Sequence, residues 1–401
     1  KINVLHIVGG KKTNGVFKGA YILHEALLNL KVNSKILNDE NIKGNNLTHY
    51  INLVNFNNSV YTNFLKNIFI FLEKIIKTIC LHSPRETFTL NFFGFDLTKS
   101  KEYKRADIIH IHWLSEGFIN LRSISKIKKP VIWTVRDMWP FTGGSHYTMD
   151  FEKYEKSTLA RYVRKFKKNC YKRNICFVTP SNWIKKIAQQ SEVLQNKKII
   201  QIDNNIDLKN FSSLPKDKAR EKLKISTKKK IILYGAQNPQ SKRKGWNFFI
   251  DALRKIDKKD YFLLIFGKFW SHKVLDEIGI EYKSMGFINE INILNEVYSS
   301  ADLFVASSIQ DAWPKTFAEV MYCGTPVVCF DNTSISEIVD HKKNGYVVNE
   351  FSSDGLKKGI EWLANEVNKN SLINKHAMEK ILNYEPKIIA SKYIKIYNQL
   401  I

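Results

Sequence analysis

The chain has 401 residues, of which 44% are hydrophobic and 12% are aromatic. It is too long for one ordinary core and apolar enough to bury two, which excludes a largely disordered protein. The formal net charge of +25 favours an anionic partner, which could be nucleic acid, an anionic membrane surface or a phosphorylated substrate.

The sequence contains no apolar run of ~18 residues, and Lys1 leads directly into a strand-like run over 2–8, so we expect neither a membrane-spanning helix nor a signal peptide. A cytoplasmic location is therefore expected. The cysteines show no CxxC pair and no zinc-ligand spacing, so we expect reduced packing residues. They are Cys80, Cys170, Cys176, Cys323 and Cys329.

Short apolar runs rich in β-branched residues alternate with longer amphipathic stretches, which is typical of βαβ units around parallel sheets. A polar, lysine-rich segment around Pro215 divides them into two series. The pattern predicts an α/β protein with two doubly wound Rossmann-like domains, over 1–204 and 205–385, and a C-terminal helix over about 386–401 that packs back on the first. Strands are expected at 2–8, 32–37, 106–112, 130–135, 176–180 and 199–203, then at 230–235, 261–267, 301–306, 325–330 and 345–348.

The first strand is followed by a glycine-containing turn with Gly9, Gly10 and Gly15, and then by a predicted helix over 21–30. Glycines allow close backbone approach and positive φ, as a loop facing an anion requires. The turn is not the dinucleotide-binding GxGxxG motif, and an ordinary strand-to-helix connection is the competing interpretation.

Polar and aromatic residues crowd the segment 131–147, directly after a predicted buried strand. Arg136, Asp137, Trp139 and His146 indicate a binding loop rather than a simple connection. For His146 two interpretations stay open, a ligand contact or a histidine whose hydrogen bonds are satisfied inside a packed loop.

Three cations, Lys242, Arg243 and Lys244, follow the first strand of the second series. Cations at the carboxyl end of such a strand can neutralise a diphosphate and the charge that builds on it as it leaves. We place Lys244 first and Arg243 second in this role. The competing interpretation is a solvated basic turn.

The window 307–328 is the most informative of the chain. It predicts a strand end, a loop, a helix over 315–322 that follows Pro314, and a stop at Gly324 before the next strand. Asp311 lies in the loop and Glu319 on the helix, and the N-terminus of the helix would stabilise a diphosphate in the crevice at the strand ends. A loop aspartate and a surface glutamate are the alternative.

This window resembles the retaining glycosyltransferases of family 4, whose hallmark is two acidic residues separated by seven, followed by Gly-x-Pro-Val-Val. The resemblance implies the GT-B fold, in which two Rossmann-like domains face each other across a cleft. It implies that Asp311 contacts the donor sugar, Glu319 the ribose hydroxyls, and Lys244 and Arg243 the diphosphate. Aspartate stands here where glutamate is commoner in the family.

The same resemblance extends to both domains. Arg136 replaces the histidine that a bacterial polysaccharide subgroup carries before Asp137, and Asn205 replaces the glycine of the family's Asn-Gly-Ile-Asp turn, where asparagine could keep a left-handed conformation. His146 joins Asp311, Lys244 and Arg243 as a catalytic candidate, and Arg136, Asp137 and Trp139 are placed on the acceptor side. The remaining donor-binding candidates are Gly15, Lys315, Thr316, Phe317, Gly267 and Phe287.

The resemblance implies a hexosyltransferase that uses a UDP- or GDP-sugar donor and a glycan or undecaprenyl-linked acceptor in bacterial surface polysaccharide or lipopolysaccharide synthesis, with retained configuration. No Asp-x-Asp occurs in the sequence, so we expect no metal and no other cofactor, with cations and a helix terminus acting instead. One rival is a nucleotide-sugar 2-epimerase of the same fold. Another is a nucleic-acid-binding protein, but no recognition motif for nucleic acid is present, and no nucleic-acid partner is expected.

Two stretches predict docking on the anionic inner face of a membrane. One is the basic run over 161–173, and the other is the apolar stripe at helical spacing over 61–79. A solvated basic helix and an ordinary core-facing helix are the alternatives. We therefore expect a peripheral protein on the inner face of the cytoplasmic membrane.

Overall fold

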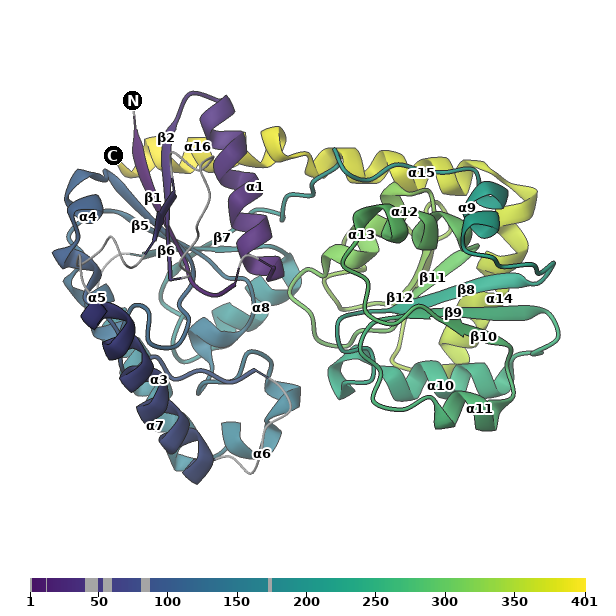
Figure 1. The fold of residues 1–401 in the computed structure, drawn as a ribbon, viewed down its shortest axis with the longest axis horizontal. Coiled ribbons are helices and arrows are strands. Elements are labelled where there is room, and N and C mark those ends of the chain that lie inside the picture. Colours follow the sequence, from purple (N-terminus) through teal and green to yellow (C-terminus); the bar gives the residue numbers. More distant parts are fainter. Residues whose placement is uncertain (1, 12, 40–49, 53–59, 81–86, 172–174) are drawn as a thin grey trace. The chain divides into compact units, whose positions relative to one another are not determined.

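A computed structural model describes all residues except 1, 12, 40–49, 53–59, 81–86 and 172–174. The chain forms two compact units (Figure 1). The first contains Lys1–Asn205 together with Pro386–Ile401, and the second contains Ile206–Glu385.

The first unit is built on a parallel sheet of seven strands in the order β3-β2-β1-β4-β5-β6-β7. Its strands are β1 (Asn3–Val8), β2 (Asn33–Asn38), β3 (Tyr50–Asn52), β4 (Ile108–Trp113), β5 (Val131–Thr134), β6 (Ile175–Thr179) and β7 (Lys198–Gln201). Its α-helices are α1 (Gly15–Asn29), α3 (Val60–Cys80), α4 (Lys101–Arg105), α5 (Leu121–Lys126), α6 (Glu152–Glu155), α7 (Thr158–Cys170), α8 (Asn182–Gln190) and α16 (Pro386–Leu400).

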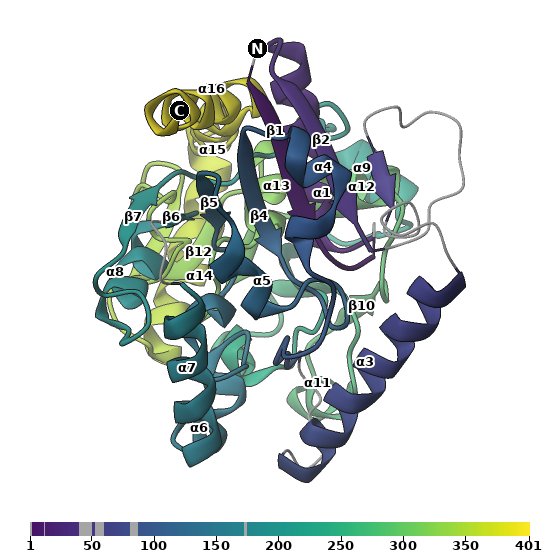
Figure 2. The ribbon, with the colours of Figure 1, turned by 90° about the vertical axis from the view of Figure 1, so that its left-hand side faces the viewer.

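The last helix, α16, completes the core of the first unit although it follows the second unit in the sequence. Its buried Ile389 and Tyr393 join Leu23 of α1 and the strand residues Val4 and Ile108 in one cluster. Both helices therefore cover the same face of the sheet, as Figures 1 and 2 show.

The second unit contains a parallel sheet of six strands in the order β10-β9-β8-β11-β12-β13. The strands are β8 (Lys230–Gly235), β9 (Tyr261–Phe266), β10 (Tyr282–Ser284), β11 (Leu303–Ala306), β12 (Val327–Phe330) and β13 (Gly345–Val348). The α-helices are α9 (Lys216–Lys222), α10 (Trp246–Lys255), α11 (Lys273–Ile278), α12 (Ile291–Ser300), α13 (Lys315–Tyr322), α14 (Ser353–Lys369) and α15 (Leu372–Ile381).

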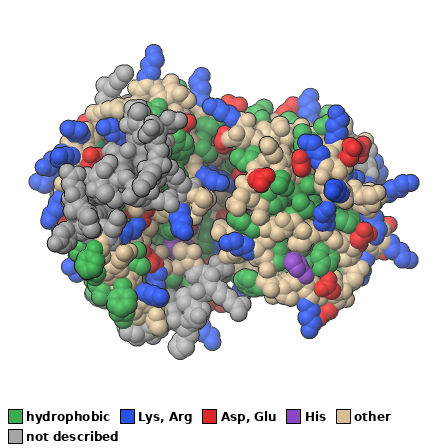
Figure 3. Space-filling view, viewed as in Figure 1, with side chains coloured by type: hydrophobic (Ala, Val, Ile, Leu, Met, Phe, Trp, Pro, Cys, Tyr) green, Lys and Arg blue, Asp and Glu red, His purple; other side chains and the backbone are tan. Residues whose placement is uncertain are grey.

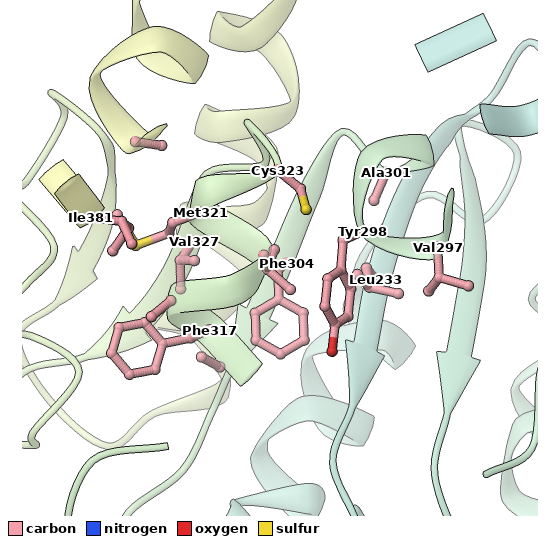
Figure 4. Packing of buried hydrophobic residues seen from close by; sticks show 14 of the residues in the cluster. Leu233, Val297, Tyr298, Ala301, Phe304, Phe317, Met321, Cys323, Val327 and Ile381 are labelled. Carbon is pink, nitrogen blue, oxygen red and sulfur yellow. The ribbon is translucent and has the colours of Figure 1, made fainter. Parts of the chain in front are cut away.

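Helices cover both faces of this second sheet, and for that reason its central strands are apolar without alternation. One face packs Phe304 and Val327 against Tyr298 of α12 and Phe317 of α13 (Figure 4). The strand order reverses between β8 and β11, since the chain continues from β8 to β9 on one side and from β11 to β12 on the other. Such a switch point is where doubly wound sheets bind ligands, beyond the carboxyl ends of the strands.

The fold confirms two doubly wound Rossmann-like units and corrects several details. Helix α1 begins at Gly15 rather than at residue 21, because Phe17 and Ala20 are already buried on its inner face. The strands β3 and β10 were not predicted, and each has only three residues. The left-handed turn expected at Asn205 is wrong, since this residue does not have a positive φ. Its buried side chain donates to the carbonyl of Gly19 instead.

None of the described helices is both long enough and apolar enough to cross a membrane.

Candidate functional site

The loops that follow β8 and β11 are joined at the switch point of the second sheet. The backbone N–H of Ile309 donates to the carbonyl of Arg243 over 2.8 Å, and the Ser307 hydroxyl donates to the carbonyl of Lys244 over 2.9 Å. Gly245 ends the basic turn with φ +68°, and a Cβ there would lie 1.9 Å from the carbonyl oxygen of Ser307. Only glycine fits this position, so the close joining of the two loops depends on it.

This joining brings the predicted cations onto the first predicted carboxylate. The Lys244 ammonium group forms an ion pair with Oδ2 of Asp311, and Nη1 of Arg243 lies 3.5 Å from the same oxygen. All three side chains are largely buried. Burial alone would raise the pKa of Asp311, but Lys244 and then Arg243 outweigh it and hold that pKa below its usual value. Asp311 is thus an ionised carboxylate inside a cationic setting.

The second predicted carboxylate lies on α13. The hydroxyl of Tyr298 donates to Oε2 of Glu319 over 3.3 Å. Burial and then the charge of Glu319 raise the pKa of Tyr298 well above its usual value, so that the phenol remains a donor. The tyrosine is held in turn by stacking on Phe211 and by an edge contact with Phe266. The hydrogen bond from the Tyr298 hydroxyl therefore gives the Glu319 carboxylate a fixed orientation.

A cavity opens beside these residues at the carboxyl ends of β8 and β11. Lys244 and the small residues of the two loops line it, together with the first turn of α13. Its lining includes Gly235, Ala236, Lys244, Ser307, Ser308, Pro314, Thr316 and Phe317. A lysine opposite the N-terminal end of a helix is a setting that stabilises a diphosphate.

Of the donor-binding residues predicted in the second unit, Thr316 and Phe317 line this cavity. The others, Glu319, Lys315, Gly267 and Phe287, lie outside its lining. Phe287 is 48% exposed, with the Lys268 ammonium 4.9 Å from its ring centroid. Gly267 has φ +119°, and a Cβ there would lie 1.9 Å from the carbonyl of Ala236, so packing alone explains this glycine. Lys315 begins α13 and is partly buried.

Sequence reasoning missed Ser307, Ser308 and Ala236, which line the cavity. The available signal was their small size directly after a predicted strand, where a ligand can approach the backbone.

In the first unit, Arg136 follows β5 and reaches inward. Its Nη1 donates to Oδ1 of Asn204 over 2.5 Å, and its Nη2 lies 3.0 Å from Nδ1 of His112. Among the described residues no carboxylate pairs with this guanidinium, and its Nε atom is buried without a hydrogen-bond partner. A buried cation with an open donor suits an anionic ligand.

The neighbouring His146 is held on both ring nitrogens. Nδ1 lies 2.7 Å from Oδ2 of Asp137, and Nε2 lies 3.0 Å from the hydroxyl of Thr89. Asp137 also accepts the backbone N–H of Trp139, whose indole N–H donates to the carbonyl of Thr89. This geometry favours the interpretation of His146 as a satisfied residue that shapes its loop, with Asp137 and Trp139 as parts of the same frame.

Lys167 of α7 supports that frame from behind. It is fully buried, its ammonium donates to the carbonyls of Trp139 and Thr142, and it lies 3.9 Å from the centroid of the Trp139 ring. Burial lowers the pKa of Lys167 to about 7, although the charges of Glu155 and Asp137 act in the opposite direction. The prediction that this lysine belongs to a membrane-facing basic surface is therefore wrong.

The rest of the predicted basic run divides into two groups. Arg164 is paired with Glu155 and Glu192, whereas the cations of α7 other than Arg164 and Lys167 are exposed. Lys172 and Arg173 lie outside the described residues. The exposed cations of α7 are Arg161, Lys165 and Lys168.

Three buried histidines of the first unit, His6, His110 and His112, have ring nitrogens close enough together to hold a metal ion. Five of their six ring nitrogens already have partners: His6 with His112, His112 with Arg136, and His110 with Thr134 and Tyr397. Burial lowers all three pKa values well below the usual value. Because the Arg136 cation adjoins this neutral network, we assign no metal to it.

A second cavity lies at the carboxyl ends of β1 and β4 in the first unit. Gly10, Trp113 and Thr89 line it on the strand side, and Lys66 and Ile70 line it from α3. The buried Thr89 that lines it also contacts His146. The loop predicted to face the acceptor therefore adjoins a cavity.

Gly15 does not line this second cavity. A Cβ at Gly15 would meet nothing within 4 Å, so the protein's own packing does not require a glycine there.

The chain thus has two Rossmann-like units, one of which carries a cavity lined by a lysine at the switch point of its sheet, and it is an α/β protein of the doubly wound class. Two family models match the chain. The model described as "Glycosyltransferase Family 4" matches residues 71–210, and the one described as "Glycosyl transferases group 1" matches residues 215–380. The chain belongs to this family of glycosyltransferases.

Some curated proteins are similar to this chain over part of its length. The N,N'-diacetylbacillosaminyl-diphospho-undecaprenol alpha-1,3-N-acetylgalactosaminyltransferase of Campylobacter jejuni is 23% identical over 39% of this chain and 42% of its own length. For two of the curated relatives the chain spans about half of their length.

Two solved structures show the same fold over the whole chain. Sucrose-phosphate synthase from Thermosynechococcus elongatus has a TM-score of 0.70 at 15% identity, covering 100% of this chain and 99% of the other. HepE from Anabaena, solved with UDP and glucose, has a TM-score of 0.64 at 16% identity, covering 100% of both chains.

Proposed function

We propose that this protein transfers a sugar from a nucleotide-sugar donor, held by the second unit, to a glycan or lipid-linked glycan acceptor bound by the first. The observation that carries the proposal is the cluster of Lys244, Arg243 and Asp311 beside the cavity at the switch point. Glu319 on α13 is assigned to the ribose hydroxyls. The matching family models and the UDP and glucose complex of the Anabaena neighbour support this assignment.

In the proposed reaction, the bond between the anomeric carbon and the diphosphate breaks while an acceptor oxygen bonds to that carbon. The proton of the acceptor hydroxyl passes to the leaving diphosphate, on the same face of the sugar, so that the configuration is retained. Lys244, Arg243 and the first turn of α13 stabilise the charge that develops on the diphosphate. Asp311 orients the donor sugar, and the ion pair with Lys244 holds its carboxylate in place.

The rival function is a nucleotide-sugar 2-epimerase, which needs no acceptor. Purified protein is to be incubated with UDP- and GDP-sugars, with and without an undecaprenyl-linked glycan, and the products separated by mass spectrometry. We expect a heavier glycan only when acceptor is present. Conversion of a nucleotide sugar to its isomer without acceptor would establish the epimerase instead.

We expect transfer to persist in EDTA at the rate measured without it, because two cations and a helix terminus take the place of a metal on the diphosphate. Initial rates with EDTA, with added magnesium and with added manganese are to be compared at equal ionic strength. Loss of turnover in EDTA with recovery on adding either metal would refute this part of the proposal.

The proposed acceptor is lipid-linked, and the proposed place of action is the inner face of the cytoplasmic membrane, where the protein acts as a peripheral enzyme of surface polysaccharide synthesis. The undecaprenol-linked substrate in the name of the Campylobacter relative supports a lipid-linked acceptor. The net charge of +25 supports an anionic surface.

A further inference from the structure

Helix α3 is oriented with Lys66, Glu73 and Lys77 toward the rest of the unit and a row of large apolar residues toward solvent. Phe64, Ile68, Phe71 and Ile75 follow one another at intervals of four, three and four residues, which places them on one face of the helix. Their exposed fractions are 61%, 36%, 62% and 41%. A helix that packs on a domain normally buries such a row, so the alternative of an ordinary core-facing stripe is wrong for these four residues.

The opposite face of α3 explains the orientation. Glu73 is buried and accepts the backbone N–H groups of Leu90 and Phe92 over 3.2 and 2.7 Å. Lys66 pairs with Asp39 over 3.1 Å, and Lys77 pairs with Glu116. These contacts fix the rotation of the helix about its axis.

Apolar contacts support the same rotation. Phe69 on the inner side packs against the rings of Phe93 and Phe95. The exposed row is therefore a stable feature of the folded unit, which Figure 3 shows as hydrophobic side chains gathered at the lower left, where Figure 1 places α3.

The charges around this row select its partner. Glu73, the one acidic residue in the sequence of α3, is buried, and the exposed Lys74 borders the row. The segment that receives Glu73 also contacts α7, since the ring of Phe92 lies 5.3 Å from that of Phe166. The exposed cations Arg161, Lys165 and Lys168 therefore belong to the same part of the unit. An apolar row with cations beside it and no exposed acid on its helix matches an anionic lipid surface.

We propose that α3 lies in the plane of an anionic membrane and inserts Phe64, Ile68, Phe71 and Ile75 among the acyl chains, while Lys74 and the cations of α7 contact the headgroups. The proposal rests on the membrane location proposed above and assigns the contacting element. The inner face of α3 supplies Lys66 and Ile70 to the cavity of the first unit. An acceptor headgroup near the lipid surface would thus lie near that cavity.

The test is flotation of the full chain with phosphatidylcholine vesicles that contain increasing phosphatidylglycerol. We expect binding to rise with phosphatidylglycerol and fall with salt. The double variant Phe64→Ser with Phe71→Ser is expected to bind at least about tenfold more weakly, because each ring loses burial in the bilayer. The matched control is Leu372→Ser, a 51% exposed apolar residue of the second unit, which should bind as the wild type does.

Equal vesicle binding by the double variant and the wild type would overturn the proposal. It would also be overturned if the wild-type protein did not bind vesicles and instead formed a dimer that the double variant does not form. Sedimentation analysis and circular dichroism of each variant separate dimer loss and unfolding from loss of lipid contact. Transfer to a water-soluble acceptor analogue should be unchanged in the double variant. Failure of transfer with intact flotation would count against the proposed function alone.

Discussion

Replacing Lys244 with alanine is expected to lower kcat/KM for sugar transfer by about 10²- to 10³-fold, because a buried cation is removed from the place where the diphosphate leaves. The side chain ends beside Asp311 and lines the cavity, so its loss removes charge without emptying a core. Initial rates of the purified variant over a range of donor concentrations provide the measurement.

Two further variants show whether the loss is specific. Glu319→Ala should also lose most of its activity, through weaker donor binding, while both variants keep the circular dichroism of the folded protein. Lys242→Ala is the matched control, since Lys242 belongs to the same short turn but does not line the cavity. Activity like that of the wild type in Lys244→Ala or in Glu319→Ala would remove that residue from the assignment.

Lys167→Met is expected to change how stability depends on pH. The pKa of Lys167 is lowered to about 7 in the folded chain by burial, and the unfolded value is about 10.4. Between these two values the unfolded chain binds more protons, so this group makes the wild type more stable as the pH rises. The gain between pH 7 and pH 9 is about 2 kcal/mol in the free energy of unfolding, and the variant should lack it.

The measurement is urea unfolding of the wild type and of Lys167→Met at pH 7 and at pH 9. The change in the free energy of unfolding between the two pH values is compared for the two proteins. A difference in the free energy of unfolding that is the same at both pH values comes from the hydrogen bonds lost at the carbonyls of Trp139 and Thr142, and it does not bear on the pKa of Lys167. Lys165→Met, at an exposed position of the same helix, should match the wild type at both values. If Lys167→Met keeps the full pH dependence, the lysine is not held with a lowered pKa.

Local patterns predicted most of the fold. Short apolar runs rich in β-branched residues identified eleven of the thirteen strands in the described part of the chain, and Pro314 and Gly324 bracketed α13 correctly. The two missed strands, β3 and β10, have three residues each, which is too short for a periodic signal.

The candidate site was predicted in part, because spacing along one helix is visible in a sequence and contacts between distant loops are not. Asp311 and Glu319 could be singled out together, yet the ion pair between Lys244 and Asp311 joins positions 67 apart and depends on the sheet order. Because β8 and β11 are neighbours in the sheet, the loops that carry Lys244 and Asp311 lie next to each other. The short side chains of Ser307 and Ser308 carry too little signal to be found without the cavity.

Helix orientation was the least predictable feature. The spacing over 61–79 shows that α3 has an apolar face, but only the contacts of Glu73 show that this face points outward. On α7, Lys167 looks like any other lysine of a basic run, and its burial under Trp139 follows from the packing of a distant loop.

The central claim, that the second unit binds the diphosphate and ribose of a nucleotide sugar, is tested most directly by thermal unfolding with UDP, GDP and the corresponding nucleosides. A ligand at about 100 times its Kd stabilises the folded state by about 2.7 kcal/mol, enough to raise the unfolding temperature by several degrees. We predict a rise with UDP or GDP that Lys244→Ala and Glu319→Ala each largely abolish. No rise with either diphosphate, or an equal rise in both variants, would contradict the account.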